Sequence, residues 1–188
     1  AVWEQAGSQL GLQGLAIPEN YGGAGFSFAE QAVVLEEFGA ALYGGPYLAS
    51  AVLAATALLA SPDEGARRGL LPDIASGQTV ATLAFTEDGG SWDPAAIRLS
   101  AVKDGAAWRL DGHKSFVLDG TTAGLILVAA ATDAGLSLFA TGDSRTSARL
   151  VAIYPHGYWH DENMWPWELY EMLNLAAADG AINCWNDK

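Results

Sequence analysis

A change in the period of the apolar residues near Gly77 constrains the fold of this chain more than any other feature. Before Gly77 the apolar residues recur at helical spacing, whereas after it they mostly alternate with polar residues, as in a half-buried strand. Helices followed by strands are typical of an α+β fold, with a helical layer and an antiparallel sheet or barrel. We therefore expect a partial helical domain over 1–77, a partial β-domain over 78–147 and a tail of different character over 148–188.

Local signals place several helices in the first part. Residues 27–30 (Ser-Phe-Ala-Glu) have the spacing of a capping box, and apolar residues follow at helical intervals. A helix is expected over 47–60, where apolar residues on all sides predict burial. Another is expected to start at Ser61, with Pro62 in its first helical position.

Strands and turns are predicted after Gly77. Asp104-Gly105 and Asp111-Gly112 are dipeptides that favour hairpin turns. The alternating or β-type runs predict strands at 79–86, 97–102, 108–110, 115–118, 125–131 and 136–140.

Composition excludes some classes of partner. The chain has 9 Lys and Arg against 22 Asp and Glu, a net charge of −13. We expect no nucleic-acid partner and no anionic membrane surface, because both favour basic patches. The longest apolar stretch has 14 residues, and a membrane-spanning helix needs about 20. With Cys184 as its only cysteine and no signal peptide at its start, the chain is expected to be cytoplasmic and to begin inside a longer protein.

Five stretches, taken in order, resemble the acyl-CoA dehydrogenase family. The first runs from a helix end through Ile17-Pro-Glu to a Tyr-Gly-Gly-Ala-Gly loop, and the fourth contains Thr86-Glu-Asp-Gly-Gly-Ser91. The fifth contains Gly112-His-Lys-Ser-Phe-Val117, similar to a hairpin of the family. The five stretches are 10–25, 30–42, 70–77, 82–91 and 110–117.

The resemblance implies an N-terminal helical domain, a middle β-domain and a C-terminal four-helix bundle. It also implies FAD as cofactor, an acyl-CoA thioester as substrate and a homo- or hetero-oligomer for the intact protein. In the family a carboxylate of the bundle removes the α proton while hydride leaves the β carbon for the flavin. No stretch of this chain resembles that bundle, so no catalytic residue is expected in it, and the chain is expected to be a fragment.

The resemblance also indicates which residues would hold the flavin. Thr86 would contact the isoalloxazine ring, and Phe116 would pack beside it. The loop containing Gly90 and Ser91 would approach the pyrophosphate and, through Ser91, the acyl-CoA. The alternative is that residues 86–90 have only a structural role, as the end of a strand and a turn. The cofactor-binding residues expected from the resemblance are Leu83, Phe85, Thr86, Gly90, Ser91, Phe116 and Leu118.

Two residues of the expected flavin site, Asp88 and Leu118, depart from the family pattern. Asp88 stands where proline is usual, and its carboxylate would repel a pyrophosphate unless it points to solvent. Leu118 stands where a hydroxyl is usual near flavin N5. We therefore expect weak FAD binding, and an alternative function is a non-catalytic partner subunit or a fold relic that binds a full-length relative.

The tail supplies a third hypothesis, a binding module whose Trp-rich surface contacts a partner. His156, His160, Asp161 and Glu162 have a spacing that would suit a metal only on a helix, and the neighbouring prolines and glycine argue against one. We expect no metal site. Glu168 and Glu171 are interpreted as a solvated helix face rather than the missing base. His113 is interpreted as an exposed hairpin residue.

Overall fold

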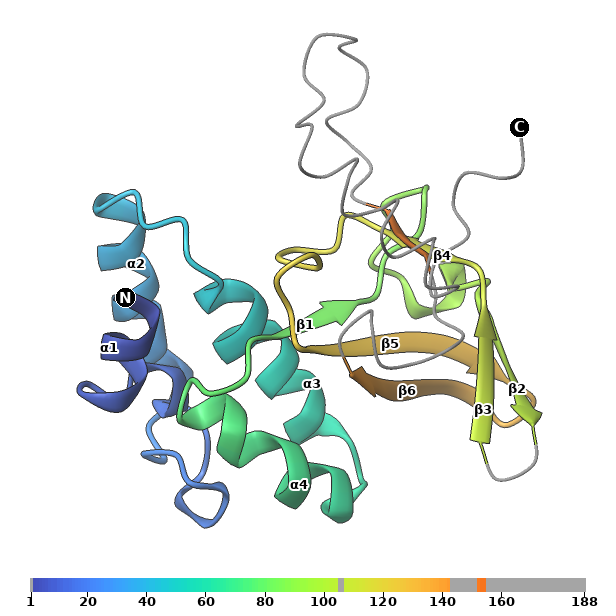
Figure 1. Ribbon diagram of the computed structural model, residues 1–188. Helices are drawn as coiled ribbons and strands as arrows, with labels where there is room; N and C mark the ends of the chain where they lie inside the picture. The colour runs from blue at the N-terminus through green and yellow to red at the C-terminus, as the bar shows by residue number, and fades with distance from the viewer. Residues whose placement is uncertain (1, 105–106, 143–151, 155–188) are drawn as a thin grey trace, which may run out of the picture. The chain divides into compact units, whose positions relative to one another are not determined.

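The computed structural model describes residues 2–104, 107–142 and 152–154 (Figure 1). The chain divides into two compact units, Ala1–Leu83 with Thr121–Ala123, and Ala84–Gly120 with Gly124–Lys188. The prediction of helices followed by a sheet is confirmed. In the described ranges no helix combines the length and apolar character that crossing a membrane requires.

The helical unit contains short helical turns between longer helices. Its elements are α1 (Val2–Ser8), η1 (Leu12–Gly14), η2 (Glu19–Tyr21), α2 (Phe28–Ala40), η3 (Leu48–Ala54), α3 (Ala55–Ala60) and α4 (Glu64–Ala75). The predicted capping box is confirmed at the start of α2. The Ser27 hydroxyl accepts the Ala29 N–H, and the Ser27 N–H donates to Glu30 over 2.9 Å. These bonds satisfy N–H groups that the first turn leaves without a helical partner.

The predicted helix over 47–60 begins as a π-helix, η3, and continues as α3. Two buried polar side chains bond to main-chain groups around η3. The Gln31 amide donates to the Ala51 carbonyl over 3.0 Å, and the Ser50 hydroxyl accepts the Ala81 N–H over 3.0 Å. The second bond ties this helix to the first residue of the first strand.

Two details of the helical unit correct or explain the sequence pattern. The N-cap of α4 is Asp63, whose carboxylate accepts the Ala66 N–H, so Pro62 precedes the helix and the prediction that it occupies the first helical position is wrong. In the glycine-rich loop a Cβ on Gly23 would lie 1.9 Å from the Ile17 carbonyl oxygen. Only glycine permits this close approach of two backbone segments.

The strands are β1 (Ala81–Ala84), β2 (Ser100–Asp104), β3 (Ala107–Asp111), β4 (His113–Ser115), β5 (Leu125–Thr132), β6 (Gly135–Gly142) and β7 (Ala152–Tyr154), and η4 (Pro94–Ala96) is a 3₁₀ turn. β5 and β6 pair antiparallel from Leu125↔Gly142 to Thr132↔Gly135, side by side in Figure 1. β2 and β3 form the predicted hairpin at Asp104. β2 also pairs parallel with β5, so the sheet is mixed rather than purely antiparallel.

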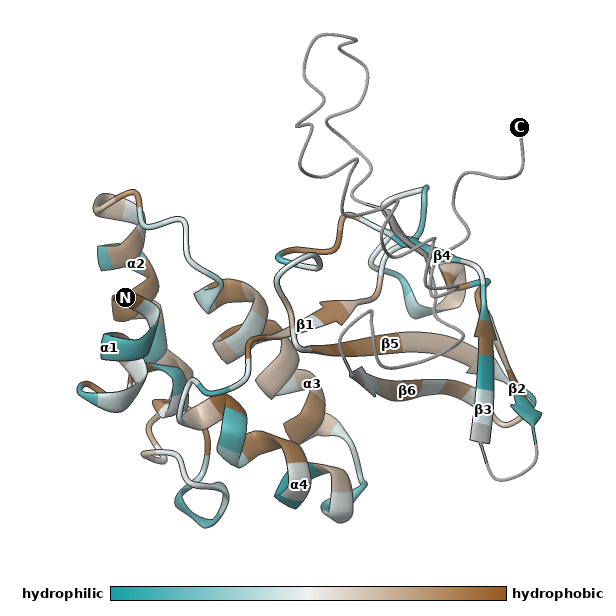
Figure 2. Ribbon diagram, in the orientation of Figure 1, coloured by the Kyte–Doolittle hydropathy of each residue, from teal (hydrophilic) through white to brown (hydrophobic). Residues whose placement is uncertain are grey.

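The interior of the second unit centres on β5. Residues 125–130 are all buried, and Figure 2 colours most of this strand as hydrophobic. A continuous apolar run of this length is typical of a strand covered on both faces. The alternation predicted before it is confirmed at Ile97, Leu99 and Ala101, which are buried.

The hairpin predicted at Asp111-Gly112 is wrong. β4 pairs with β7 in parallel rather than with β3, and it ends at Ser115 instead of running to residue 118. The backbone explains both differences. Gly112 has a φ of +143° and Phe116 a φ of +58°, conformations that turn the chain away from a continuous strand on either side of β4.

Candidate functional site

Thr86, just beyond β1, and Ser115, at the end of β4, form the centre of the candidate site. The Thr86 hydroxyl donates to the Ser115 carbonyl, and the Ser115 N–H donates to the Thr86 carbonyl over 2.9 Å. Both side chains are buried. Because this bond uses the single hydroxyl proton of Thr86, the hydroxyl oxygen can serve a ligand only as an acceptor while the bond lasts.

Lys114 and Glu87 form an ion pair at this centre. The Lys114 Nζ lies 2.9 Å from Glu87 Oε1 and donates to the Phe85 carbonyl over 3.1 Å. The Lys114 side chain is 0% exposed. The Glu87 carboxylate also accepts the N–H groups of Arg98 and Leu99. These partners satisfy both charges, as a buried ion pair requires.

The pair affects the pKa values of both groups. Burial lowers the pKa of Lys114, and the hydrogen bond and charge of Glu87 offset only part of that effect. Burial alone would raise the pKa of Glu87, but hydrogen bonds from Lys114 and the two backbone N–H groups outweigh it, so this pKa is lowered. Glu87 is therefore a carboxylate at neutral pH and accepts all three donors.

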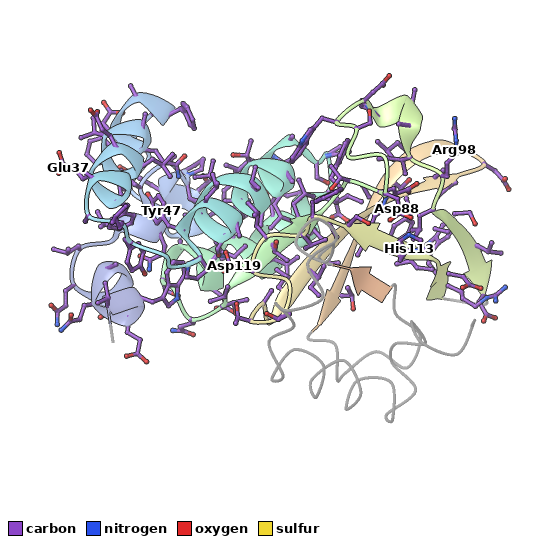
Figure 3. All side chains as sticks on the ribbon, turned by 90° about the horizontal axis from the view of Figure 1, so that it is seen from above. Glu37, Tyr47, Asp88, Arg98, His113 and Asp119 are labelled. Atoms are coloured by element: carbon purple, nitrogen blue, oxygen red, sulfur yellow. The ribbon has the colours of Figure 1, made fainter. Side chains whose placement is uncertain are left out.

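Asp88, the next residue, bonds to the neighbouring positions of β4. Its Oδ1 accepts the Ser115 hydroxyl over 2.6 Å, and its Oδ2 lies 2.8 Å from Nε2 of His113. Figure 3 shows Asp88 and His113 next to each other. Both oxygens of this exposed carboxylate thus have partners on one strand.

The turn that follows is closed by its backbone. The Gly90 N–H donates to the Glu87 carbonyl over 2.7 Å, and Gly90 has a φ of +64°, which favours glycine. A Cβ on Gly90 would lie 3.5 Å from Cε2 of Phe116, so the turn and the Phe116 ring are neighbours. Ser91 is exposed, and its hydroxyl accepts the Asp93 N–H over 3.1 Å.

The segment after β4 combines backbone strain with exposed apolar side chains. Phe116 and Asp119 have φ values of +58° and +52°, and such a conformation costs about 1–3 kcal/mol for a residue other than glycine. Phe116 and Leu118 are 45% and 46% exposed, although Val117 between them is buried. Burial raises the pKa of the Asp119 carboxyl. Strain of this kind concentrates at sites that bind ligands.

Leu83 and Phe85 are half-buried on either side of a buried alanine. The Phe85 ring stacks on Trp92 with a centroid distance of 5.6 Å and an interplanar angle of 14°. This contact joins the two ends of the 86–91 loop through an apolar surface.

Similarity to known proteins supplies a family for this arrangement. Residues 1–78 match the family described as "Acyl-CoA dehydrogenase, N-terminal domain". (2S)-Methylsuccinyl-CoA dehydrogenase from Cereibacter sphaeroides is 33% identical over 142 residues, which cover 72% of this chain and 26% of that protein. The chain belongs to the acyl-CoA dehydrogenase family.

Solved structures of this family share the fold. A glutaryl-CoA dehydrogenase from Mycobacterium smegmatis in complex with FADH2 has a TM-score of 0.67 at 25% identity, over 75% of this chain and 36% of that one. The ChsE4-ChsE5 complex from Mycobacterium tuberculosis contains a chain with a TM-score of 0.65 at 33% identity, over 75% and 37%. The chain spans about a quarter to a third of the length of the curated acyl-CoA dehydrogenases it matches.

The family resemblance predicted from the sequence is therefore confirmed, and members of this family are FAD-dependent oxidoreductases. Six of the seven predicted flavin-binding residues lie in the second unit, and Leu83 is the last residue of the first stretch of the helical unit. The structure brings Gly90 next to Phe116, and Thr86 next to the residue before Phe116. The roles of all seven residues stay predictions, as do the predicted domain limits.

Sequence reasoning missed the importance of Lys114 and His113. The signal for Lys114 was a lysine inside the motif Gly112-His-Lys-Ser, part of the stretch 110–117 that resembles the family. His113 is exposed, as expected, but it is paired with Asp88. Asp88 itself is an exposed residue held by two donors.

The predictions on the tail concern residues outside the described ranges. These are the hypothetical metal ligands His156, His160, Asp161 and Glu162, the glutamates Glu168 and Glu171, and the Trp-rich surface. Across 2–104, 107–142 and 152–154, no three or more His, Cys, Asp or Glu residues are grouped so as to hold a metal ion.

Proposed function

We propose that this chain is the N-terminal and middle part of a FAD-dependent acyl-CoA dehydrogenase that desaturates an acyl-CoA thioester between its α and β carbons. The observation that carries the proposal is the strained segment 116–119, where Phe116 and Leu118 stay about half exposed and the Phe116 ring lies next to the Gly90 turn. Exposed apolar surface beside polar loops is typical of ligand sites.

The residues of the second unit fit a flavin. Phe116 and Leu118 offer apolar surface for an isoalloxazine ring. Thr86 offers an acceptor oxygen, Gly90 permits close backbone approach, and the exposed Ser91 hydroxyl still has a proton to donate. Leu83 and Phe85 would line the site with their backbone. When bound, FAD would accept the hydride that desaturation releases.

The substrate would be positioned by the same loop and by other parts of the intact protein. Ser91, beyond the Gly90 turn, would contact the acyl-CoA. By resemblance to the family, the proton at the α carbon would go to a carboxylate of the C-terminal bundle of the intact protein. Hydrogen bonds to the thioester carbonyl would stabilise the developing enolate-like charge.

We further propose that the intact protein is a homo- or hetero-oligomer in the cytoplasm. The ChsE4-ChsE5 structure is a complex of two named proteins, which supports the hetero-oligomeric form as a hypothesis for this chain. We also propose a part in fatty-acid metabolism, which the family resemblance suggests, and we propose the cytoplasmic location from the sequence alone.

A second candidate function is a non-catalytic partner subunit or fold relic. The observation in its favour is that neither of these two flavin-side positions can donate a hydroxyl proton to the flavin. Leu118 has no hydroxyl, and the Thr86 hydroxyl donates its proton to the Ser115 carbonyl. A protein of this kind would keep the fold and bind FAD weakly or not at all.

Titration of the purified 188-residue chain with FAD separates the two candidates. The visible spectrum and the quenching of flavin fluorescence report binding. If the first proposal is right, Phe116→Ala weakens binding about tenfold, because about 1.4 kcal/mol of apolar and stacking contact is lost. The matched control is Trp108→Ala, which removes another half-exposed aromatic, from β3, and should leave FAD binding unchanged.

A gain-of-function pair sharpens the same test. Leu118→Thr adds the missing hydroxyl and is expected to tighten FAD binding about fivefold, the effect of one added hydrogen bond. Leu118→Val introduces a side chain of the same shape as threonine but without a hydroxyl, so it should not tighten FAD binding. A colourless wild-type chain that stays unbound in excess FAD would contradict the first proposal and support the second.

A further inference from the structure

Two consecutive carboxylates of the loop hold strand β4 from both of its faces. Side chains of neighbouring strand residues point to opposite faces, so His113 and Ser115 share one face of β4 and Lys114 lies on the other. Oε1 of Glu87 forms an ion pair with Nζ of Lys114 at 2.9 Å. Asp88, one residue later, forms hydrogen bonds with Nε2 of His113 at 2.8 Å and with the Ser115 hydroxyl at 2.6 Å.

The two attachments differ in burial. The Lys114 side chain is fully buried, and Glu87 has two further donors from the backbone. His113 and Asp88 have side chains that are 48% and 58% exposed. The Glu87 attachment therefore belongs to the interior of the unit, whereas the Asp88 attachment lies at the surface where a ligand would approach.

Beyond Asp88 the loop is restrained by one backbone bond, from the Gly90 N–H to the Glu87 carbonyl, and by the Phe85–Trp92 stack that joins its two ends. Gly89 and Gly90 follow directly, and glycine has the largest backbone freedom of any residue. A Cβ on Gly89 would meet no atom within 4 Å, so side-chain packing does not confine this point. Side chains at the start of the turn, Glu87 and Asp88, tie it to β4, so they contribute to its order together with these contacts.

We propose that Asp88 is a positioning residue for this loop: by bridging His113 and Ser115 it helps to hold Gly90 beside Phe116 and, one residue further along, Ser91. A carboxylate suits this role because its two oxygens accept two donors at once. The two donors also offset its negative charge, which would otherwise oppose an anionic ligand at the loop. The consequence for FAD rests on the proposed function, whereas the consequence for loop order does not.

Hydrogen exchange of the full chain without flavin tests the loop itself. Asp88→Ala is expected to speed exchange of the 86–91 amides about tenfold, as the loss of two exposed hydrogen bonds predicts. Exchange in β5 should stay unchanged and shows that the variant is folded. The matched control is Asp133→Ala, which removes an exposed aspartate from the β5–β6 turn and should alter only that turn.

Partial variants separate the bridge from a simple loss of charge. Asp88→Asn keeps one acceptor oxygen and should give an intermediate exchange rate. His113→Ala removes one partner only, and combined with Asp88→Ala it should add almost nothing to the effect of Asp88→Ala, since the two residues act through one contact. Additive effects of the two substitutions would contradict the bridge.

FAD titration then links the loop to the ligand. Asp88→Ala is expected to weaken FAD binding at least fivefold relative to Asp133→Ala, whereas a carboxylate that merely repels FAD would give tighter binding in Asp88→Ala. Unchanged exchange at 86–91 in Asp88→Ala overturns the proposal whatever FAD does. A wild-type chain that binds no FAD counts against the proposed function instead, and the exchange result still decides the role of Asp88.

Discussion

In the helical unit the buried polar side chains bond to the backbone, whereas beside β4 acidic side chains bond to other side chains. Gln13, Gln31 and Ser50 are neutral, and each meets a main-chain group. At β4, Glu87 meets Lys114 and Asp88 meets His113. The helical unit therefore uses neutral polar groups to fix its own helices, while the second unit uses carboxylates to attach a loop to β4 at the candidate site.

The largest expected effect is the loss of one partner from the buried ion pair. Glu87→Ala leaves the fully buried Lys114 ammonium without its carboxylate. We expect the free energy of unfolding, measured by urea denaturation, to fall by about 3–5 kcal/mol.

A double variant checks the cause. Glu87→Leu combined with Lys114→Met removes both charges and should recover a large part of the loss, because no buried charge is left unpaired. If the double variant is as unstable as Glu87→Ala, the charges are not what distinguishes this region from the helical unit.

The next effect concerns a neutral contact in the helical unit. Gln31→Met keeps the side-chain length but leaves the Ala51 carbonyl of η3 without its amide donor. The expected loss is about 1–2 kcal/mol in the same denaturation experiment, equal at pH 5 and pH 8 because no charge is involved. Gln5→Met on α1, an exposed position, should change stability by less than about 0.5 kcal/mol.

Low pH should decrease the free energy of unfolding, because Glu87 becomes protonated. Its pKa is lower in the folded chain, so the folded state gains stability above the usual pKa of an unfolded glutamate, and that gain is lost as pH falls through the lowered value. Denaturation midpoints between pH 6 and pH 2.5 should therefore fall, and Glu87→Gln should flatten part of that fall.

Other groups limit how flat the curve can become. Hydrogen bonds from Ser27 lower the pKa of Glu30, and a hydrogen bond from Tyr21 lowers that of Glu64, so some acid dependence persists in every variant. Glu37→Gln changes an exposed glutamate of α2 and serves as the control. If Glu37→Gln flattens the curve as much as Glu87→Gln, Glu87 has no special part in it.

The smallest expected effect is at Asp119. Burial raises the pKa of its carboxyl, so the folded state favours the protonated form and loses that advantage as pH rises through the raised value. Asp119→Asn should therefore be slightly stabilising at pH 7, by less than about 0.5 kcal/mol, and asparagine also tolerates the φ of +52°. At pH 3 the two proteins should be nearly equal; a larger gain at pH 3 would contradict the explanation.

The sequence by itself determined the elements whose signals are local. The capping box at Ser27, the hairpin at Asp104, the strand β5 and the family resemblance were all predicted from the sequence. These signals succeed because a helix cap, a turn or a strand face depends on residues within a few positions of one another.

Only the tertiary structure decided which strand β4 pairs with and which side chains meet there. Lys114 and Glu87 are 27 positions apart, as are Ser115 and Asp88, and nothing local marks them as partners. The failed hairpin at Asp111 has the same origin, because β4 pairs with residues 152–154 instead of its neighbour β3. Pairing over such distances depends on the summed burial and hydrogen bonding of the whole unit, which no short stretch of sequence contains.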